Sequence, residues 1–138
     1  MERMSKRGGC QCGRIRFQAA VDPDGAYLCH CRMCQRATGA PVVAWLTVRR
    51  AAFAWIEGEP AVYRSSPKAE RLFCRRCGAQ LVFREIAEPD HLDVTIASLD
   101  KPEALPPGHH GWTASRIAWF DSADDLPRYP EHGPSASS

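Results

Sequence analysis

Seven cysteines constrain this chain of 138 residues more than any other feature. They fall into three groups, at Cys10/Cys12, Cys29/Cys31/Cys34 and Cys74/Cys77. The N-terminal stretch MERMSKRGG has no apolar core, so it predicts no secretory signal, and no apolar run approaches the roughly 18 residues of a membrane span. We therefore expect a cytoplasmic protein without a membrane partner, in which thiols stay reduced. An odd number of reduced thiols indicates metal ligands or catalytic groups.

Two of the three groups share a glycine directly after the second cysteine, in CQCG (residues 10–13) and CRRCG (residues 74–78). A loop that curls around a metal-bound sulfur often needs a residue at positive φ, which glycine adopts without steric cost. Four thiolates complete a tetrahedron and leave no position for a substrate, so the pattern predicts a structural zinc site. Such a site would join segments more than sixty residues apart and contribute directly to folding. The predicted ligands are Cys10, Cys12, Cys74 and Cys77.

The remaining group lies in LCHCRMCQRATG (residues 28–39) and supplies three thiols, Cys29, Cys31 and Cys34. Three protein ligands with an open fourth position are the composition of a catalytic zinc site. The alternative is a second structural site that a histidine completes. His30 is nearest, but on an extended segment its side chain points away from both neighbours. The more distant candidates are His91, His109, His110 and His132.

The segments between the cysteines predict a mainly β fold with at most short helices. Eleven prolines and ten glycines favour turns and short strands. One domain is expected over residues 5–130, and the polar end EHGPSASS (131–138) is expected to be a flexible tail. A helix of two turns is predicted from Cys31 or Arg32 to Thr38, with Gly39 as its stop. Strands are predicted at Arg14–Val21, Val42–Val48, Ala61–Ser66, on both sides of CRRC, in HLDVTIASL (91–99) and at Thr113–Phe120.

Three longer stretches resemble one known family. GGCQCGRIRF, CHCRMCQRATGAP and YRSSPKAERLFCRRCGAQL are similar to the glutathione-dependent formaldehyde-activating enzyme family, which includes centromere protein V-type proteins. The later stretches HLDVTIASLDKPE and IAWFDSADDLPRYP fit the usual ending of its members, so the resemblance covers about residues 8–130.

The resemblance implies a compact zinc-stabilised domain of coiled antiparallel strands. It also implies one structural zinc on Cys10, Cys12, Cys74 and Cys77, and one exchangeable, catalytic zinc on Cys29, Cys31 and Cys34. The implied activity is that of a carbon–sulfur lyase, which joins glutathione and formaldehyde in S-hydroxymethylglutathione. Three thiolates weaken zinc as a Lewis acid, so the chemistry of a bound thiol is favoured over activation of water.

The expected partner is therefore a small thiol similar to glutathione. Because glutathione carries two carboxylates, its site should offer cationic side chains. Arg32 and Arg36 flank the three-cysteine motif and would share a helix face. The further candidates are Arg14, Arg71, Arg75 and Arg76.

Two non-enzymatic classes were weighed against the lyase. The first is a zinc-stabilised β module that binds a protein partner, and it stays open as the alternative. The second is a nucleic-acid-binding zinc ribbon, which usually has two C-x-x-C pairs about 15–20 residues apart. The pairs here are unequal and distant, and the formal charge of +2 would become −1 with seven thiolates on two zinc ions (+2 − 7 + 4). We therefore expect no nucleic-acid partner.

Overall fold

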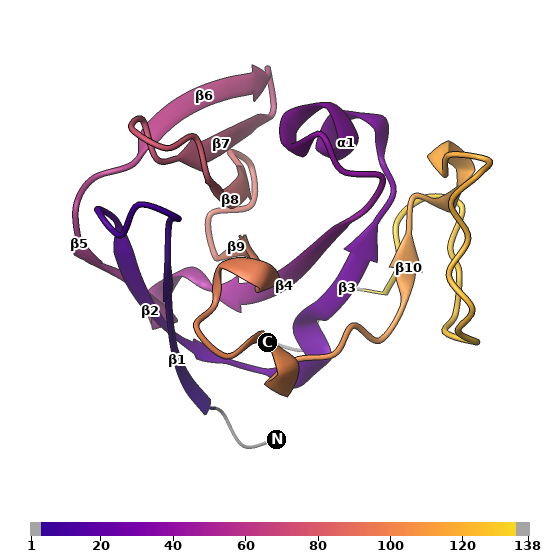
Figure 1. Ribbon diagram of the computed structural model, residues 1–138, viewed down its shortest axis with the longest axis horizontal. Coiled ribbons are helices and arrows are strands. Elements are labelled where there is room, and N and C mark those ends of the chain that lie inside the picture. Colours follow the sequence, from indigo (N-terminus) through magenta and orange to yellow (C-terminus); the bar gives the residue numbers. More distant parts are fainter. Residues whose placement is uncertain (1–3, 135–138) are drawn as a thin grey trace.

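Strands dominate the structure, a computed structural model that describes residues 4–134 (Figure 1). The strands are β1 (Met4–Gly9), β2 (Arg16–Val21), β3 (Ala26–Cys29), β4 (Val43–Arg49), β5 (Phe53–Glu57), β6 (Ala61–Ser66), β7 (Ala69–Phe73), β8 (Gln80–Glu85), β9 (His91–Thr95) and β10 (His110–Gly111). The one α-helix of the described residues is α1 (Arg32–Thr38). Short 3₁₀ turns lie at Pro23–Gly25, Arg50–Ala52, Ile96–Ser98, Pro102–Ala104 and Thr113–Ser115.

The strands form two sheets. The smaller has the order β1-β2-β5, and the larger has the order β10-β3-β4-β9-β8-β7-β6. Every pair of these strands is antiparallel except β10 with β3. The two sheets curl around a common interior (Figure 1). The prediction of a mainly β fold of antiparallel strands is thus confirmed.

The core lies where β2 of the small sheet meets the large sheet. Alternate residues of β2 and of the residues just before it point inward, and Ile15, Phe17 and Ala19 are at most 2% exposed. They pack in one cluster with residues of the large sheet, among them Leu46 of β4 and Val94 of β9. Apolar residues at every second position of the sequence therefore all lie on the buried face of the strand, as expected for a sheet of which one face is covered.

Most of the predicted strands are present within a residue or two of their expected bounds. Ala61–Ser66 is β6 as predicted, and the two strands on either side of CRRC form the hairpin β7–β8. The strands β1, β3 and β10 were not predicted, and the polar strand β1 shows why. Its side chains carry no apolar alternation, and its conformation follows from pairing with β2 along its whole length.

The prediction of a strand at Thr113–Phe120 was wrong. The segment begins with a 3₁₀ turn, and Trp119 at its far end is 76% exposed. Its backbone bonds are made with the C-terminal segment: the amides of Thr113 and Ala114 donate to the carbonyls of residues 129 and 130. The guanidinium of Arg116 donates to three carbonyls of residues 117–120, which closes the segment into a loop.

The predicted helix is confirmed at Arg32–Thr38, and Gly39 ends it with φ 71°. Within residues 4–134 no helix combines the length and the apolar character needed to cross a membrane. The predicted tail (131–138) lies outside the described residues from position 135 onward.

Phe17 is the residue at which the core can be tested. It is fully buried and stacks on Phe53 with a centroid distance of 5.3 Å. Replacement by alanine should lower the free energy of unfolding by about 3–5 kcal/mol, because a large cavity replaces the ring. Ile56→Ala on the neighbouring strand is the matched control, since Ile56 is 45% exposed and should cost far less. Chemical denaturation of both variants measures the difference, and equal losses would contradict this description of the core.

Candidate metal centres

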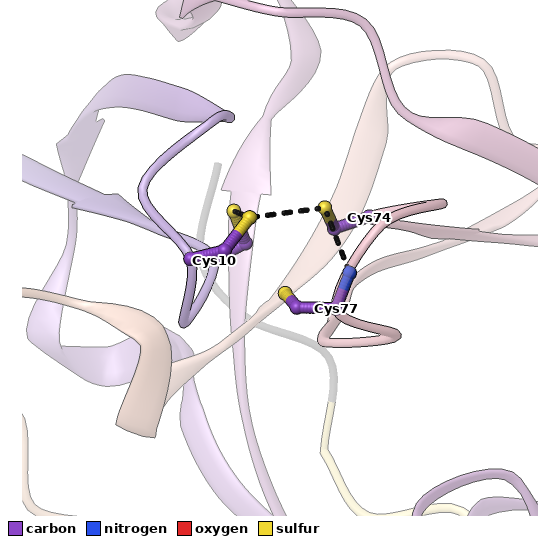
Figure 2. A group of neighbouring side chains, drawn as sticks. Cys10, Cys74 and Cys77 are labelled. Carbon is purple, nitrogen blue, oxygen red and sulfur yellow. Dashed lines mark hydrogen bonds between the residues drawn. The ribbon is translucent and has the colours of Figure 1, made fainter.

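Two hairpin turns bring four cysteines together. Cys10 and Cys12 lie in the turn between β1 and β2, and Cys74 and Cys77 lie in the turn between β7 and β8. All four sulfurs lie within 4.8 Å of one another. Figure 2 shows the side chains of Cys10, Cys74 and Cys77 converging from the two turns. One turn belongs to each sheet, so this four-cysteine cluster joins the two sheets at their hairpin ends.

The two turns have the same local design. Gly13 and Gly78 have φ values of 81° and 79°. The amide of Gly13 donates to the carbonyl of Cys10, and the amide of Gly78 donates to the carbonyl of Cys74. Each turn also aims an amide at its first sulfur, from Ile15 in one and from Cys77 in the other, at 3.3 and 3.5 Å. The positive φ values inferred from the sequence are thus present at both glycines.

The four-cysteine cluster fits a tetrahedral zinc ion. Sulfurs bound at about 2.3 Å in a tetrahedron lie about 3.8 Å apart. The measured distances are 3.6 Å between Cys10 and Cys12 and 3.7 Å between Cys12 and Cys74. Backbone amides, that of Ala79 first, lower the pKa of the Cys77 thiol to about 6, which favours the thiolate that a metal requires.

The second group lies where β3 passes into α1. Cys29 ends the strand, Cys31 is the N-cap of the helix, and Cys34 lies in its first turn. The Cys31 sulfur accepts a hydrogen bond from the amide of Cys34 at 3.3 Å, which replaces the usual oxygen of a cap. The sulfurs of Cys29 and Cys34 are 3.7 Å apart, and all three lie within 4.8 Å of one another. This three-cysteine cluster therefore has the spacing of three corners of a tetrahedron.

In the part of the chain that the structure describes, the three-cysteine cluster has no fourth ligand. No other histidine, cysteine, aspartate or glutamate ligand atom joins the three sulfurs within 4.8 Å. His30 is turned away from them, and its Nε2 lies 2.8 Å from Nδ1 of His110. His109 stacks on Tyr27, and His132 packs on Trp112. These distances and stacking partners support an open fourth position over a site that a histidine completes.

The charges of three adjacent thiols also favour a bound cation. Hydrogen bonds to the sulfurs of Cys31 and Cys34, together with burial, raise the pKa of Cys29. The same kind of contacts, from Cys29 first, lower the pKa of Cys31 to about 2. The cluster thus holds one negative charge readily, and two further thiolates need a cation to offset their repulsion. A soft divalent ion such as zinc meets that need.

Gln35, His110 and Asp124 hold this loop in place, and of these the sequence analysis named only His110, as a candidate fourth ligand. Gln35 is buried, and its Nε2 donates to the carbonyls of residues 30, 41 and 115. His110 links His30 to Asp124, whose Oδ1 lies 3.1 Å from His110 Nε2. No recognisable pattern in the sequence marks Gln35 as a residue that holds this loop. His110 and Asp124 lie far from the loop in the sequence, and the fold alone brings them to it.

Of the candidate arginines, the structure brings only Arg71 into contact with the three-cysteine cluster. Its Nη2 lies 3.5 Å from the sulfur of Cys34, and its side chain is 4% exposed. Arg36 lines a neighbouring cavity together with Arg71, whereas Arg32 on the same helix is exposed and bonds to Gln35. The other three candidate arginines are exposed and flank the cysteines of the four-cysteine cluster in the sequence; they are Arg14, Arg75 and Arg76.

Two cavities of about 500 Å³ flank the three-cysteine cluster. One is lined by Asp93 and by Tyr27, Phe83 and Trp112. These aromatic side chains pack against a buried group that consists of Cys29, Cys34, Val43 and Trp45. Trp112 has φ 59°, a strained value for a bulky residue that is often found at functional sites. The other lies between α1 and strands β6–β8, and Arg71 separates it from the sulfur of Cys34. Both volumes are in the usual range of small-molecule sites.

Comparisons with known proteins agree with this architecture. A family model described as glutathione-dependent formaldehyde-activating enzyme matches residues 5–115, so the chain belongs to that family. An uncharacterized lyase of Schizosaccharomyces pombe is 32% identical over 76 residues, and the alignment covers 55% of each protein, so the chain spans about half the length of this curated relative. A crystal structure of a Rhodobacter sphaeroides protein has a TM-score of 0.59 over 89% of this chain and 98% of that chain. Its sequence identity is 18%, so this likeness supports the fold.

Single replacements should separate the two clusters. Cys74→Ser should unfold the domain at 25 °C, since structural zinc in small peptides contributes about 10–16 kcal/mol, which matches or exceeds the usual stability of about 5–15 kcal/mol. Cys34→Ser should leave the protein folded but without its second metal. Circular dichroism and elemental analysis of the purified variants check both statements, with two zinc ions expected per wild-type chain. A single tightly held zinc in the wild type, or equal unfolding of both variants, would show that the roles are misassigned.

Proposed function

We propose that the protein is a zinc-dependent lyase of the carbon–sulfur type, which acts on a small thiol and an aldehyde at Cys29, Cys31 and Cys34. The proposal assigns a structural zinc to Cys10, Cys12, Cys74 and Cys77, and an exchangeable zinc to the three-cysteine cluster. The observation that carries it is the incomplete ligand set: three sulfurs with tetrahedral spacing and, among residues 4–134, no fourth ligand atom. Membership in the formaldehyde-activating family and the lyase name of the yeast relative support the same class of reaction.

The donor set decides which chemistry is favoured. A zinc ion on three thiolates would supply one free coordination position, at which a substrate thiol is held as the thiolate. Residues of the chain position the site. The N-cap of α1 and the hydrogen bonds of Gln35 keep the three sulfurs together, and Arg71 places a positive charge beside Cys34. This cation offsets part of the negative charge that three cysteines and a fourth thiolate would gather.

The proposed reaction adds a thiol across a carbonyl group. The substrate sulfur bonds to the carbonyl carbon, the carbon–oxygen π pair moves to oxygen, and the oxygen takes up the proton that the thiol released. Formaldehyde and glutathione give S-hydroxymethylglutathione in this way, and the reverse step breaks the carbon–sulfur bond. Neither direction needs an oxidant or a reductant. The role of the protein is to hold the thiolate next to the aldehyde and to exclude competing water.

Exchange spectroscopy with ¹³C-formaldehyde and glutathione tests this proposal. The zinc-loaded wild type should increase the rate of exchange between free formaldehyde and its thiol adduct. Cys34→Ser should reduce this rate enhancement by at least about 100-fold. Loss of a proposed direct zinc ligand should lower activity more than the 10–100-fold that is typical when a residue hydrogen-bonded to a ligand is replaced. The spontaneous rate without protein is the baseline, and Lys101→Gln, an exposed position outside both cysteine motifs, is the control variant.

A second measurement separates the lyase from its alternative, a zinc-stabilised module that binds a protein partner. Titration calorimetry with glutathione should give heat with the wild type and none with Cys34→Ser. If a protein with two zinc ions neither binds any small thiol nor accelerates the exchange, the lyase proposal fails and the binding module gains support.

We also propose a cytoplasmic location, consistent with the absence of disulfides among the described cysteines.

A further inference from the structure

We propose that Arg71, assisted by Arg36, forms a carboxylate-binding subsite beside the three-cysteine cluster, so that the protein selects thiols that carry a carboxylate close to their sulfur. The inference rests on the proposed function, because it assumes that the substrate sulfur binds at Cys29, Cys31 and Cys34. It adds the residue that recognises the substrate and the chemical class that it selects.

The subsite is a cavity of about 510 Å³ between α1 and one face of strands β6–β8. The helix contributes Met33 and Arg36, and the strands contribute Tyr63, Arg71 and Phe73. Arg71 and Phe73 are two residues apart on β7, and Tyr63 is the cross-strand partner of Arg71 on β6. Two cations therefore meet in a cavity whose lining contains no carboxylate.

Arg71 is a buried cation with capacity for a further partner. Its side chain is 96% buried (4% exposed), and within residues 4–134 it forms no ion pair with a carboxylate. Nη2 donates to the Cys34 sulfur at 3.5 Å, and the guanidinium lies 4.9 Å from the ring centre of Phe83. Nη1 is buried without any hydrogen-bond partner. An unpaired donor of this kind is costly, and it is usually explained by an ion, a water or a ligand.

A carboxylate is the ligand that this arrangement suits best. Arginine binds carboxylates through parallel bonds of its planar donors, and such charge-assisted bonds are stronger than neutral ones. Arg36 lies on the exposed turn of α1 at the same cavity, so it places a second positive charge at the entrance. The exposed side chains of Met33 (49%) and Tyr63 (61%) supply apolar walls for the carbon atoms of a ligand.

The two donors of Arg71 also limit the distance between the ligand's charge and its sulfur. Nη2 contacts the Cys34 sulfur, and Nη1 belongs to the same guanidinium. A carboxylate bound to Arg71 through Nη1 therefore lies next to the sulfurs of the cluster. The substrate sulfur must lie beside the same sulfurs. The geometry therefore favours thiols whose carboxylate is only a few bonds from the sulfur, such as short mercapto acids and peptides that end in cysteine.

Titration calorimetry with two matched thiols tests the inference on the zinc-loaded full chain. The probes are 3-mercaptopropionate and its amide, which have nearly the same shape and differ in charge. The wild type should bind the acid about tenfold more tightly or better, as expected for a charge-assisted bond in a buried site. Arg71→Gln should bring the ratio of the two affinities close to one. The ratio, and not either affinity alone, is compared between variants, because intrinsic differences between the two thiols then cancel.

Arg36 and Arg32 provide a matched pair on one helix. Arg36→Gln should lower the acid-to-amide ratio several-fold, whereas Arg32→Gln should leave it unchanged, because Arg32 does not line the cavity. Zinc content and thermal unfolding are measured for every variant. If Arg71→Gln loses zinc or unfolds, Arg36→Gln decides the question, because Arg36 is exposed and its replacement leaves the buried contact of Arg71 with Cys34 in place.

The possible results separate this inference from the proposed function. A wild type that binds acid and amide equally overturns the subsite and leaves the lyase intact. An acid-to-amide ratio that stays at the wild-type value in Arg71→Gln with its zinc retained has the same consequence, and so does a wild-type ratio in Arg36→Gln where Arg71→Gln does not fold. A wild type that binds glutathione but neither probe overturns the subsite alone. A wild type that binds neither probe nor glutathione, and that does not accelerate the exchange with formaldehyde, overturns the proposed function itself.

Discussion

The convergence of two hairpin turns on four sulfurs is the constraint on which the rest of this structure depends. One turn belongs to the three-stranded sheet and the other to the seven-stranded sheet, and the four sulfurs lie within 4.8 Å of one another. Phe17 and its neighbours fill the space between the sheets with apolar contacts, which have no preferred direction. The four-cysteine cluster adds a directional link, since tetrahedral bonding to one ion would fix how the two turns face each other. Apolar burial and a metal ion on these four sulfurs would thus act on the same interface.

The three-cysteine cluster depends on that frame without being part of it. Its cysteines lie at the end of β3 and at the start of α1 and not on the two turns, and its loop is held by Gln35 and by the contact of His30 with His110. Arg71 lies on β7, the strand that leads directly into Cys74. A change at the four-cysteine cluster would therefore move the cation next to Cys34. Through β7, the position of Arg71 beside the proposed reactive site depends on the proposed structural site.

Much of this architecture could be predicted from local patterns. Glycine after CQC and CRRC indicated a curled turn at both places, and both glycines have positive φ. The alternation of Ile15, Phe17 and Ala19 indicated a buried strand face, and Gly39 indicated the end of the helix. The misassigned segment, Thr113–Phe120, has the composition of a strand. Its backbone instead bonds to residues 129 and 130 and to Arg116, and such distant partners leave no trace in the segment itself.

The sequence by itself determined the division of the seven cysteines into a group of four and a group of three, and the alternating faces that build the two sheets. Each of these follows from residues close together in the chain, where the backbone has few conformations to choose from. Only the tertiary structure decided which side chains surround the open cluster. Arg71 is one of several arginines near a cysteine motif, and its sequence position does not distinguish it. It contacts Cys34 because β7 enters the large sheet opposite α1, and its burial leaves one nitrogen without a partner. Contacts between elements far apart in the chain depend on how the sheets pack, and that packing is a property of the whole fold.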